Sequence, residues 1–235
     1  MDYVDVNDFV SYTLEDLGVV IPHSSRMPNR WAWFWPQYLA NTPTEVVRNT
    51  VVVYHNRDGL TMRIPPDVEA VTNRARLVLV NREGHSIVWP TLAGLEAIKT
   101  RLVARIANDV EIVNPNWAGL AIDLFNQPPH LKILAKVVDP GPGFEKIEQV
   151  ARDFDWLLEL LHLGAYDGMS YIHGSVIITN RAVWIAYYAD LVPNYTIHDG
   201  EDIYFTLFSR ADGIPVIQFS ENFEHRGPSN QDVIL

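Results

Sequence analysis

The apolar positions of this sequence fall into short runs, several of which alternate with polar or small residues. The first run, RWAWFWP at residues 30–36, puts Trp31, Trp33 and Trp35 on alternate positions. Alternate residues of a strand share one face, so the pattern predicts a strand whose three indole rings lie on the same side. We expect Pro36 to close this strand and Trp33 to be buried, because large aromatic side chains dominate buried packing. A ladder of aromatic rings on a binding surface is the alternative interpretation.

Glycine-containing turns between apolar runs predict β-hairpins. Gly59, Gly84 and Gly213 each follow an arginine and an acidic residue, and each lies between two largely apolar runs. Glycine allows the positive φ that tight hairpin turns need. Four apolar runs after residue 170 are typical of a four-stranded sheet, namely YIHGSVIIT, AVWIAYY, DIYFTLF and IPVIQF.

Helical spacing of apolar residues predicts four helices, at residues 7–17, 91–107, 115–125 and 144–163. Each places its apolar side chains three and four positions apart, which brings them to one face. Together with the hairpins, these amphipathic helices predict an α+β fold of mainly antiparallel sheet with the helices packed on it.

Two segments rich in proline and glycine interrupt the chain near its middle. NQPPH and DPGPGF lie on either side of the apolar run LKILAKVV, which predicts a short strand. A domain boundary would lie here. We therefore divide the chain into an N-terminal α+β half at 1–126, a linker-like segment at 127–143 and a C-terminal α+β half at 144–235, with one continuous domain as the alternative.

The composition argues against several classes of protein. The 235 residues contain no cysteine, which excludes disulfides and thiolate metal sites, and their net charge of −11 argues against binding to nucleic acid. We find no apolar stretch long enough to cross a membrane and no basic leader in residues 1–10, so we expect a cytoplasmic protein without a membrane partner. Most of the excess acid lies after His130, where it either aids solubility or steers a basic partner.

No catalytic motif stands out, and we predict no catalytic residue, metal or cofactor. The eight histidines include no pair spaced for a metal on one helix face, and no phosphate-binding loop or nucleophile elbow is complete. The richest polar cluster lies in a long loop expected at 190–202, where catalysis, partner docking and a merely solvated surface are the three interpretations. We take partner docking as the working hypothesis, with the candidate residues Asp190, Tyr195, His198, Asp199, Glu201 and Asp202.

The order of elements in the first half is similar to one known group. A short helix is followed by SSRMPNRWAWFW, by the expected hairpin VVVYHNRDGLTMRI and by HSIVWPTLAGLEAIKTRLVARI, between Asp8 and Ile106. This order resembles the immunity proteins of actinobacterial, mycobacterial-type polymorphic toxins. The matching positions look structural, so no functional residue is carried over. The resemblance implies a non-enzymatic cytoplasmic protein that binds and neutralises a cognate secreted toxin, and the acidic charge of this chain favours a basic one.

Two other functions fit the same sequence. A small-molecule-binding protein or enzyme would use an aromatic pocket with a histidine and an acid, for which the candidates are Trp184, Tyr187, Tyr188, Tyr195 and His198. A structural subunit would instead use an apolar run such as VWIAYY as an oligomer interface.

Overall fold

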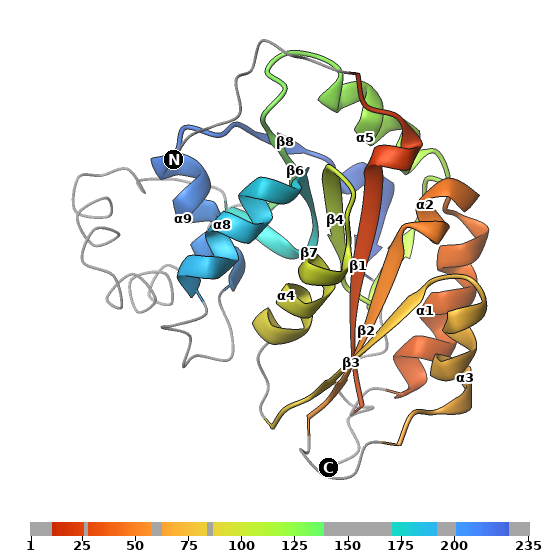
Figure 1. Ribbon diagram of the computed structural model, residues 1–235. Coiled ribbons are helices and arrows are strands. Elements are labelled where there is room, and N and C mark those ends of the chain that lie inside the picture. The colour runs from red at the N-terminus through yellow and green to blue at the C-terminus, as the bar shows by residue number, and fades with distance from the viewer. Residues whose placement is uncertain are drawn as a thin grey trace.

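Seven strands form a mixed sheet with helices on both faces (Figure 1). The computed structural model describes residues 11–25, 28–57, 63–83, 87–138, 171–191 and 201–225. The strands of this sheet are β1 (Leu17–Ser24), β2 (Thr50–Asn56), β3 (Arg76–Asn81), β4 (Leu102–Ile106), β6 (Ile133–Val138), β7 (Tyr171–Asn180) and β8 (Val216–Gln218). Their order across it is β3-β2-β1-β4-β7-β6-β8. Both halves of the chain contribute strands, and the division at 127–143 stays a prediction.

The remaining elements surround this sheet. The α-helices are α1 (Pro28–Ala40), α2 (Thr44–Arg48), α3 (Pro66–Glu69), α4 (Val88–Ala97), α5 (Trp117–Phe125), α8 (Arg181–Leu191) and α9 (Glu201–Ala211). The 3-10 helices are η1 (Leu14–Asp16), η2 (Ala70–Asn73) and η3 (Ser220–Asn222), and β5 (Val110–Ile112) pairs with β9 (Phe223–His225) in a small antiparallel sheet. Within the described ranges, no helix has the length and apolar character needed to cross a membrane.

The central sheet is largely parallel, so the expectation of antiparallel hairpins is wrong. β3, β2, β1 and β4 run in one direction, β7 runs against both β4 and β6, and β8 is parallel to β6. Burial explains the error. Every residue of β2 and β4 is buried, and so is all of β1 except its last residue. Strands covered on both faces are continuous apolar runs, and this pattern is typical of parallel sheets.

The segments with the expected hairpin turns connect strands with helices instead of joining two strands. The chain passes from β2 to α3 and from β3 to α4, and Gly213 lies between α9 and β8 with φ at 66°. Gly59 and Gly84 fall outside the described residues. Parallel strands need such crossover connections, because a tight turn can join only antiparallel neighbours.

The aromatic stretch at residues 30–36 is helical. It lies in α1, where Trp31, Phe34 and Tyr38 are fully buried at helical spacing, whereas Trp33 is only partly buried. The rings that face the core are therefore three and four residues apart, as in a helix. The alternation of Trp31, Trp33 and Trp35 wrongly predicted a strand.

The runs AVWIAYY and DIYFTLF also form helices, α8 and α9. Both runs are short and apolar, and periodicity alone does not separate a buried helix from a buried strand. Their rings pack together, with the ring centroid of Phe205 4.6 Å from that of Trp184 and 4.9 Å from that of Tyr187.

The helix expected at 91–107 is a helix followed by a strand. α4 ends at Ala97 and β4 begins at Leu102. Gly94 allows α4 to lie close to the sheet, because a Cβ atom there would be 2.4 Å from Cγ1 of Val20 on β1. The expected helix at 144–163 lies outside the described residues, and the described part of 7–17 contains η1 instead of a longer helix.

Other expected elements are confirmed. α5 lies within the helix expected at 115–125, and β6, β7 and β8 lie in the runs LKILAKVV, YIHGSVIIT and IPVIQF. These runs are bounded by clear turn residues or by polar residues.

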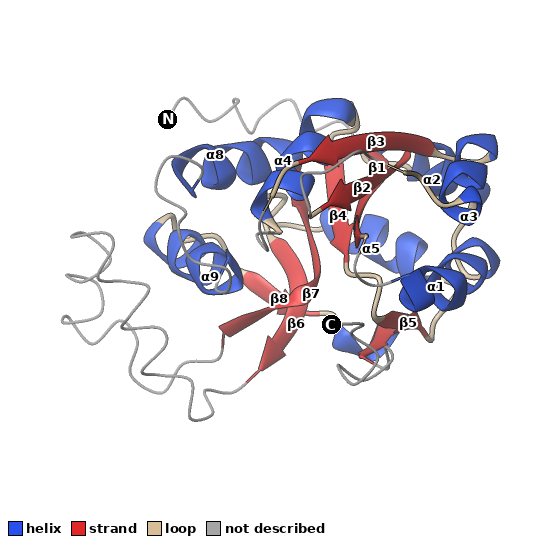
Figure 2. Cartoon of the chain, turned by 90° about the horizontal axis from the view of Figure 1, so that it is seen from below, coloured by secondary structure: helices blue, strands red, loops and turns tan. Residues whose placement is uncertain are grey.

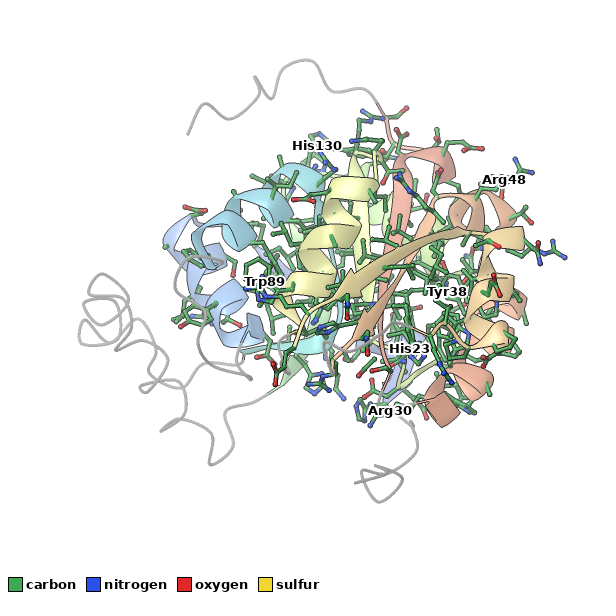
Figure 3. All side chains as sticks on the ribbon, turned by 60° about the horizontal axis from the view of Figure 1, so that its bottom comes forward. His23, Arg30, Tyr38, Arg48, Trp89 and His130 are labelled. Atoms are coloured by element: carbon green, nitrogen blue, oxygen red, sulfur yellow. The ribbon has the colours of Figure 1, made fainter. Side chains whose placement is uncertain are left out.

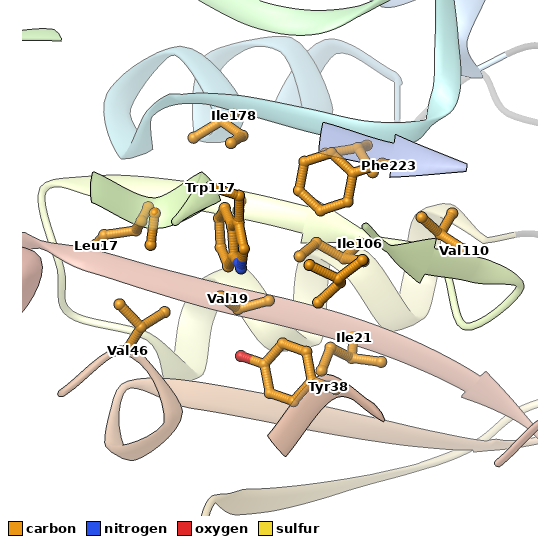
Figure 4. Close-up of a cluster of buried hydrophobic side chains, with 14 of the residues drawn as sticks. Leu17, Val19, Ile21, Tyr38, Val46, Ile106, Val110, Trp117, Ile178 and Phe223 are labelled. Carbon is orange, nitrogen blue, oxygen red and sulfur yellow. The ribbon is translucent and has the colours of Figure 1, made fainter. Parts of the chain in front are cut away.

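Helices lie on both faces of the central sheet (Figure 2), and each face carries its own hydrophobic cluster. On β1, Val19 and Ile21 join the cluster under α1, α2 and α5, whereas Val20 joins the cluster under α4, α8 and α9. Figure 4 shows part of the first cluster, where Trp117 of α5 lies among the side chains of the sheet.

Candidate functional site

The carboxyl ends of β1, β2, β3 and β4 lie at one edge of the sheet, which we call the carboxyl edge. From β1 the chain moves outward to β2 and β3, and it then returns to the other side of β1 with β4. Such a reversal of strand order opens a crevice at the carboxyl ends of the strands, where open α/β sheets bind their ligands. Figure 3 shows His23 and Arg30 at this end of the sheet and His130 and Arg48 at the opposite end.

His23 and Asn108 join the two strands at the point of reversal. His23 is the second-last residue of β1 and Asn108 follows β4, and the Asn108 amide Nδ2 donates to His23 Nδ1 at 2.8 Å. The His23 ring packs on Trp31 at 4.9 Å and on Tyr54 at 5.7 Å between ring centroids. Burial lowers the pKa of His23 to about 3, so the ring is neutral at pH 7 and its Nδ1 can accept the hydrogen bond from the Asn108 amide.

Asp109 contacts two basic side chains beside this pair. Its Oδ2 atom lies 2.9 Å from Nη1 of Arg30, in the first turn of α1, and 3.3 Å from Nε2 of His225, at the end of β9. The other oxygen, Oδ1, is buried and has no hydrogen-bond partner among the described residues. The Arg30 and Asp109 side chains are 14% and 17% exposed, so this pair is shielded from solvent far more than an ordinary surface salt bridge.

Polar groups continue along the ends of β2 and β3. The Asn56 Nδ2 atom donates to Oδ1 of Asn81 at 2.9 Å, and the backbone nitrogen of Arg57 donates to Oγ of Ser25 at 3.3 Å. The guanidinium of Arg82 lies 3.5 Å above the ring centroid of Trp89. The carboxyl edge therefore offers amide, hydroxyl and guanidinium groups, a set that suits the base, ribose and phosphate groups of a nucleotide.

A small hollow lies beyond His225, between the small sheet and the strands β6 and β7. The polar residues around it are Lys136, Ser175, Ser220, Glu224 and His225. Its apolar lining consists of Val110, Ala135, Val176, Phe219 and Phe223. Because His225 lines the hollow and also contacts Asp109, the hollow adjoins the carboxyl edge.

Three of the six predicted partner-binding residues lie in the described helices α8 and α9. Asp190 lies in the last turn of α8, Glu201 and Asp202 begin α9, and Tyr195, His198 and Asp199 lie outside the described residues. Oδ2 of Asp202 accepts from the backbone nitrogen of Gly174 at 3.3 Å. Asp202 is thus in contact with β7, and a binding role for the six residues stays a prediction.

The aromatic pocket considered as an alternative is part of the core. Trp184, Tyr187 and Tyr188 are 0%, 3% and 1% exposed and belong to the cluster under α4, α8 and α9. The Nε1 atom of Trp184 donates to the Val103 carbonyl at 2.9 Å, which fixes α8 on the sheet.

The residues of the carboxyl edge were missed at the sequence level, although the sequence carries a signal for them. Each apolar run that forms a parallel strand ends in polar residues, as in VIPHSS, VYHNR and ARIAND. Such residues gather at one place only if the strands are parallel, so the wrong fold class concealed them.

Comparison with known proteins identifies the fold. The sequence matches no family model and no curated protein. Among solved structures, a glucosyl-3-phosphoglycerate synthase from Mycobacterium tuberculosis with Mn²⁺, UDP-glucose and phosphoglyceric acid has a TM-score of 0.55 and 13% identity, over 92% of this chain and 73% of that chain. The 4-diphosphocytidyl-2C-methyl-D-erythritol synthase from Anaerococcus prevotii has a TM-score of 0.56 and 11% identity, over 95% and 96%. A mannosyltransferase from Pyrobaculum calidifontis with GDP-Man and Mn²⁺ has a TM-score of 0.53 and 15% identity, over 86% and 54%.

The shared architecture is the Rossmann-like GT-A fold of glycosyltransferases and nucleotidyltransferases. The resemblance to toxin immunity proteins is therefore wrong, and so are the non-enzymatic function and the toxin partner that it implied. The physical reason is that the resemblance relied on a strand at 30–36, a hairpin after residue 50 and a helix through residue 106. The structure has α1, the parallel strand β2 and the pair α4 and β4 in these places.

The Mn²⁺ of two of these structures raises the question of whether this chain could hold such an ion. Divalent cations of this kind need several oxygen or nitrogen ligands. Asp109 presents one oxygen to Arg30 and His225, which leaves only Oδ1 for any other group. Nowhere in the described part of the chain do three or more His, Asp or Glu side chains form a group suited to a metal. The described residues of the carboxyl edge therefore do not fit a Mn²⁺ centre.

Proposed function

We propose that this protein is a glycosyltransferase that takes a nucleotide sugar at the carboxyl edge. The observation that carries the proposal is the polar cluster of His23, Asn108, Asp109 and Arg30 at the reversal of strand order. The GT-A fold supports it, because solved structures of this fold hold UDP, UDP-glucose and GDP-Man.

Arg30 is the residue best placed to act on the diphosphate of such a donor. When the sugar leaves the nucleotide, negative charge develops on the diphosphate, and a fixed guanidinium stabilises that charge in the transition state. The 2.9 Å contact with Asp109 holds the guanidinium in place at the first turn of α1. Asn108, oriented by the neutral His23, would bind a hydroxyl or amide group of the donor.

Isothermal titration calorimetry with UDP, GDP, CDP and UDP-glucose tests this proposal. We expect one of these nucleotides to bind the wild-type protein. Replacing Arg30 by methionine removes a charge-assisted hydrogen bond and should weaken that binding by roughly tenfold or more. Arg48→Met is the matched control, because Arg48 lies in α2 at the opposite end of the sheet, and it should bind as the wild type does.

Two results would contradict the proposal. One is the absence of binding for all four nucleotides, and the other is an equal loss of affinity in the Arg30 and Arg48 variants. Arg30→Lys, which keeps the charge, should recover part of the affinity and so exclude a mere folding defect.

A second candidate function is nucleotidyl transfer. It is favoured by chain length, because the Anaerococcus prevotii synthase is covered over 96% of its length, whereas the Mycobacterium tuberculosis synthase is covered over 73%. The product distinguishes the two reactions. A glycosyltransferase releases a nucleoside diphosphate or monophosphate from a nucleotide sugar, whereas a nucleotidyltransferase releases pyrophosphate from a nucleoside triphosphate.

A further inference from the structure

His225, the last residue of β9, presents a half-exposed imidazole ring at the carboxyl edge. Its Nε2 atom lies 3.3 Å from Oδ2 of Asp109, and its side chain is 49% exposed. The same carboxylate oxygen lies 2.9 Å from Nη1 of Arg30. The imidazole and the guanidinium can therefore be no farther apart than these two contacts added together. A basic ring thus lies beside the cation that we assign to the diphosphate of the donor.

Asp109 favours one form of the neutral His225 ring. A carboxylate attracts an N–H group and repels a lone pair, so the proton of the neutral ring favours Nε2, the nitrogen that faces Oδ2. Nδ1 then keeps its lone pair, and it makes no hydrogen bond to the part of the chain that the structure describes. The ring is therefore in the form that can take a proton at Nδ1.

Three other histidines of the described residues lie near this edge, and each is less suited to take a proton from a substrate. His23 and His55 are 2% and 4% exposed, so a substrate cannot reach their rings. The Nδ1 atom of His173 accepts a hydrogen bond from a backbone nitrogen of β7 at 3.2 Å, which uses its lone pair. His225 is the histidine that combines an exposed ring with a lone pair left for a substrate.

Contacts from several elements fix the position of His225. It lies opposite Val110 in the pairing of β5 with β9, and its ring packs edge to face on His173 with the centroids 5.9 Å apart. The Gln37 side chain of α1 holds β5 through two hydrogen bonds of 3.0 Å, to the Val110 carbonyl and from the Ile112 backbone nitrogen. Catalytic groups need such support, because a base acts only when it is held close to the proton that it takes.

We propose that His225 is the general base of the transfer reaction. The oxygen of the acceptor hydroxyl attacks the anomeric carbon of the sugar, and the proton of that hydroxyl passes to Nδ1 of His225. The bond between the anomeric carbon and the diphosphate breaks, and its electron pair goes to the diphosphate, where Arg30 stabilises the charge. Asp109 stabilises the imidazolium that forms. This inference rests on the proposed glycosyltransferase function.

A base supplied by the protein has a stereochemical consequence. The departing diphosphate does not have to take the proton, so the acceptor can attack the face of the sugar opposite to it. The configuration at the anomeric carbon is then inverted, as in hydrolases that activate a water on the opposite face of the ring.

Water can serve as the acceptor in the test, because a base that takes the proton of a hydroxyl also activates water. The probe is the nucleotide sugar whose base binds best in calorimetry, chosen from UDP-glucose, GDP-mannose and CDP-glucose. We expect slow hydrolysis, which releases the nucleoside diphosphate and the free sugar. Proton NMR of the sugar at early times, before its anomers interconvert, should show the inverted anomer.

His225→Gln tests the base directly. Glutamine can still contact Asp109 but cannot take the proton, so kcat for hydrolysis should fall by about a hundredfold or more, while KM stays within about twofold. Imidazole in solution should restore part of the rate of His225→Ala. His130→Gln is the matched control, because His130 lies at the opposite end of the sheet (Figure 3), and it should hydrolyse the probe as the wild type does.

The outcomes separate this inference from the proposed function. A protein that binds the nucleotide sugar but does not hydrolyse it, or hydrolyses it as fast after His225→Gln, keeps the donor site and overturns the role of His225. Release of the sugar with retained configuration also overturns that role, because the diphosphate then takes the proton. Absence of nucleotide binding overturns the glycosyltransferase function, and the inference with it.

Discussion

His23 is a histidine that burial keeps neutral at pH 7. Its ring lies between Trp31 and Tyr54, and its only described hydrogen bond is with Asn108. A histidine of this kind has a structural effect on the site, because it decides which way the Asn108 amide points. Sequence reasoning could not assign this role, since it depends on residues 85 positions apart.

The lowered pKa of His23 predicts how stability depends on pH. Its pKa is about 3 in the folded protein, whereas an unfolded histidine titrates near 6.5. The unfolded chain therefore binds the proton first, and the free energy of unfolding should fall as the pH drops from about 6.5 toward 3, by up to about 1.4 kcal/mol for each pH unit. His23→Gln cannot titrate, so urea unfolding at a series of pH values should show a smaller slope for this variant. Parallel slopes for the two proteins would mean that His23 is protonated in the native state.

Trp31 and Trp33 differ in burial although they are two positions apart in the same helix. Trp31 is 1% exposed, whereas Trp33 is only partly buried against the same cluster. Trp31→Ala should therefore cost about 3–5 kcal/mol of unfolding free energy, and Trp33→Ala clearly less. Chemical denaturation of both variants provides the comparison, and a larger cost at Trp33 would contradict the packing of α1 described here.

At the scale of elements, the sequence allows the buried runs to be located but not their type. LKILAKVV and YIHGSVIIT are strands as expected, whereas AVWIAYY and DIYFTLF, which are equally apolar and similarly short, are helices. The difference lies in their tertiary neighbours, because α8 and α9 cover a sheet face that no local pattern reveals. The antiparallel strand β7 beside β4 is a further non-local feature.

The candidate site could have been located only after the strands were recognised as parallel. The runs that form β1, β2 and β4 are apolar on both faces, and this continuity is the available evidence for parallel strands. The contacts of Arg30 and His225 with Asp109 join residues far apart in the chain and do not follow from spacing.

Two helix glycines predict opposite effects of the same substitution. A Cβ atom at Gly94 would lie 2.4 Å from Val20 in the packed sheet, whereas at Gly119 the nearest atom, at 2.7 Å, is the end of the Asn116 side chain, which can rotate away. Gly94→Ala should destabilise the protein by about 1–3 kcal/mol through overpacking. Gly119→Ala should be neutral or stabilising by up to about 1 kcal/mol, because alanine favours the helix. Thermal unfolding of the two variants checks the pair, and similar melting temperatures would contradict the close packing of α4 on β1.

At the scale of the whole molecule, the charges are unevenly distributed. The chain has a net charge of −11, yet Arg30, Arg57, Arg82 and Lys136 all lie at the carboxyl edge or the adjoining hollow. Basic groups gathered at one site of an acidic protein attract anionic ligands, while the remaining surface repels nonspecific polyanions. This distribution fits the proposed nucleotide sugar better than a nucleic acid.

The same distribution predicts that nucleotide binding does not need a divalent cation. In the described carboxyl edge, the carboxylate of Asp109 is occupied by Arg30 and His225, so basic side chains take the place that a metal would need. The affinity for the bound nucleotide should therefore be the same, within about twofold, in EDTA and in excess Mn²⁺, because the fixed cations neutralise the diphosphate in both conditions. Calorimetric titrations in the two buffers make the comparison, with Arg48→Met as the control for effects of surface charge. Asp109→Asn should weaken nucleotide binding in both buffers, because Arg30 then loses the partner that orients it. A gain of tenfold or more in Mn²⁺, removed by Asp109→Asn, would instead identify Asp109 as a metal ligand and overturn this account of the site.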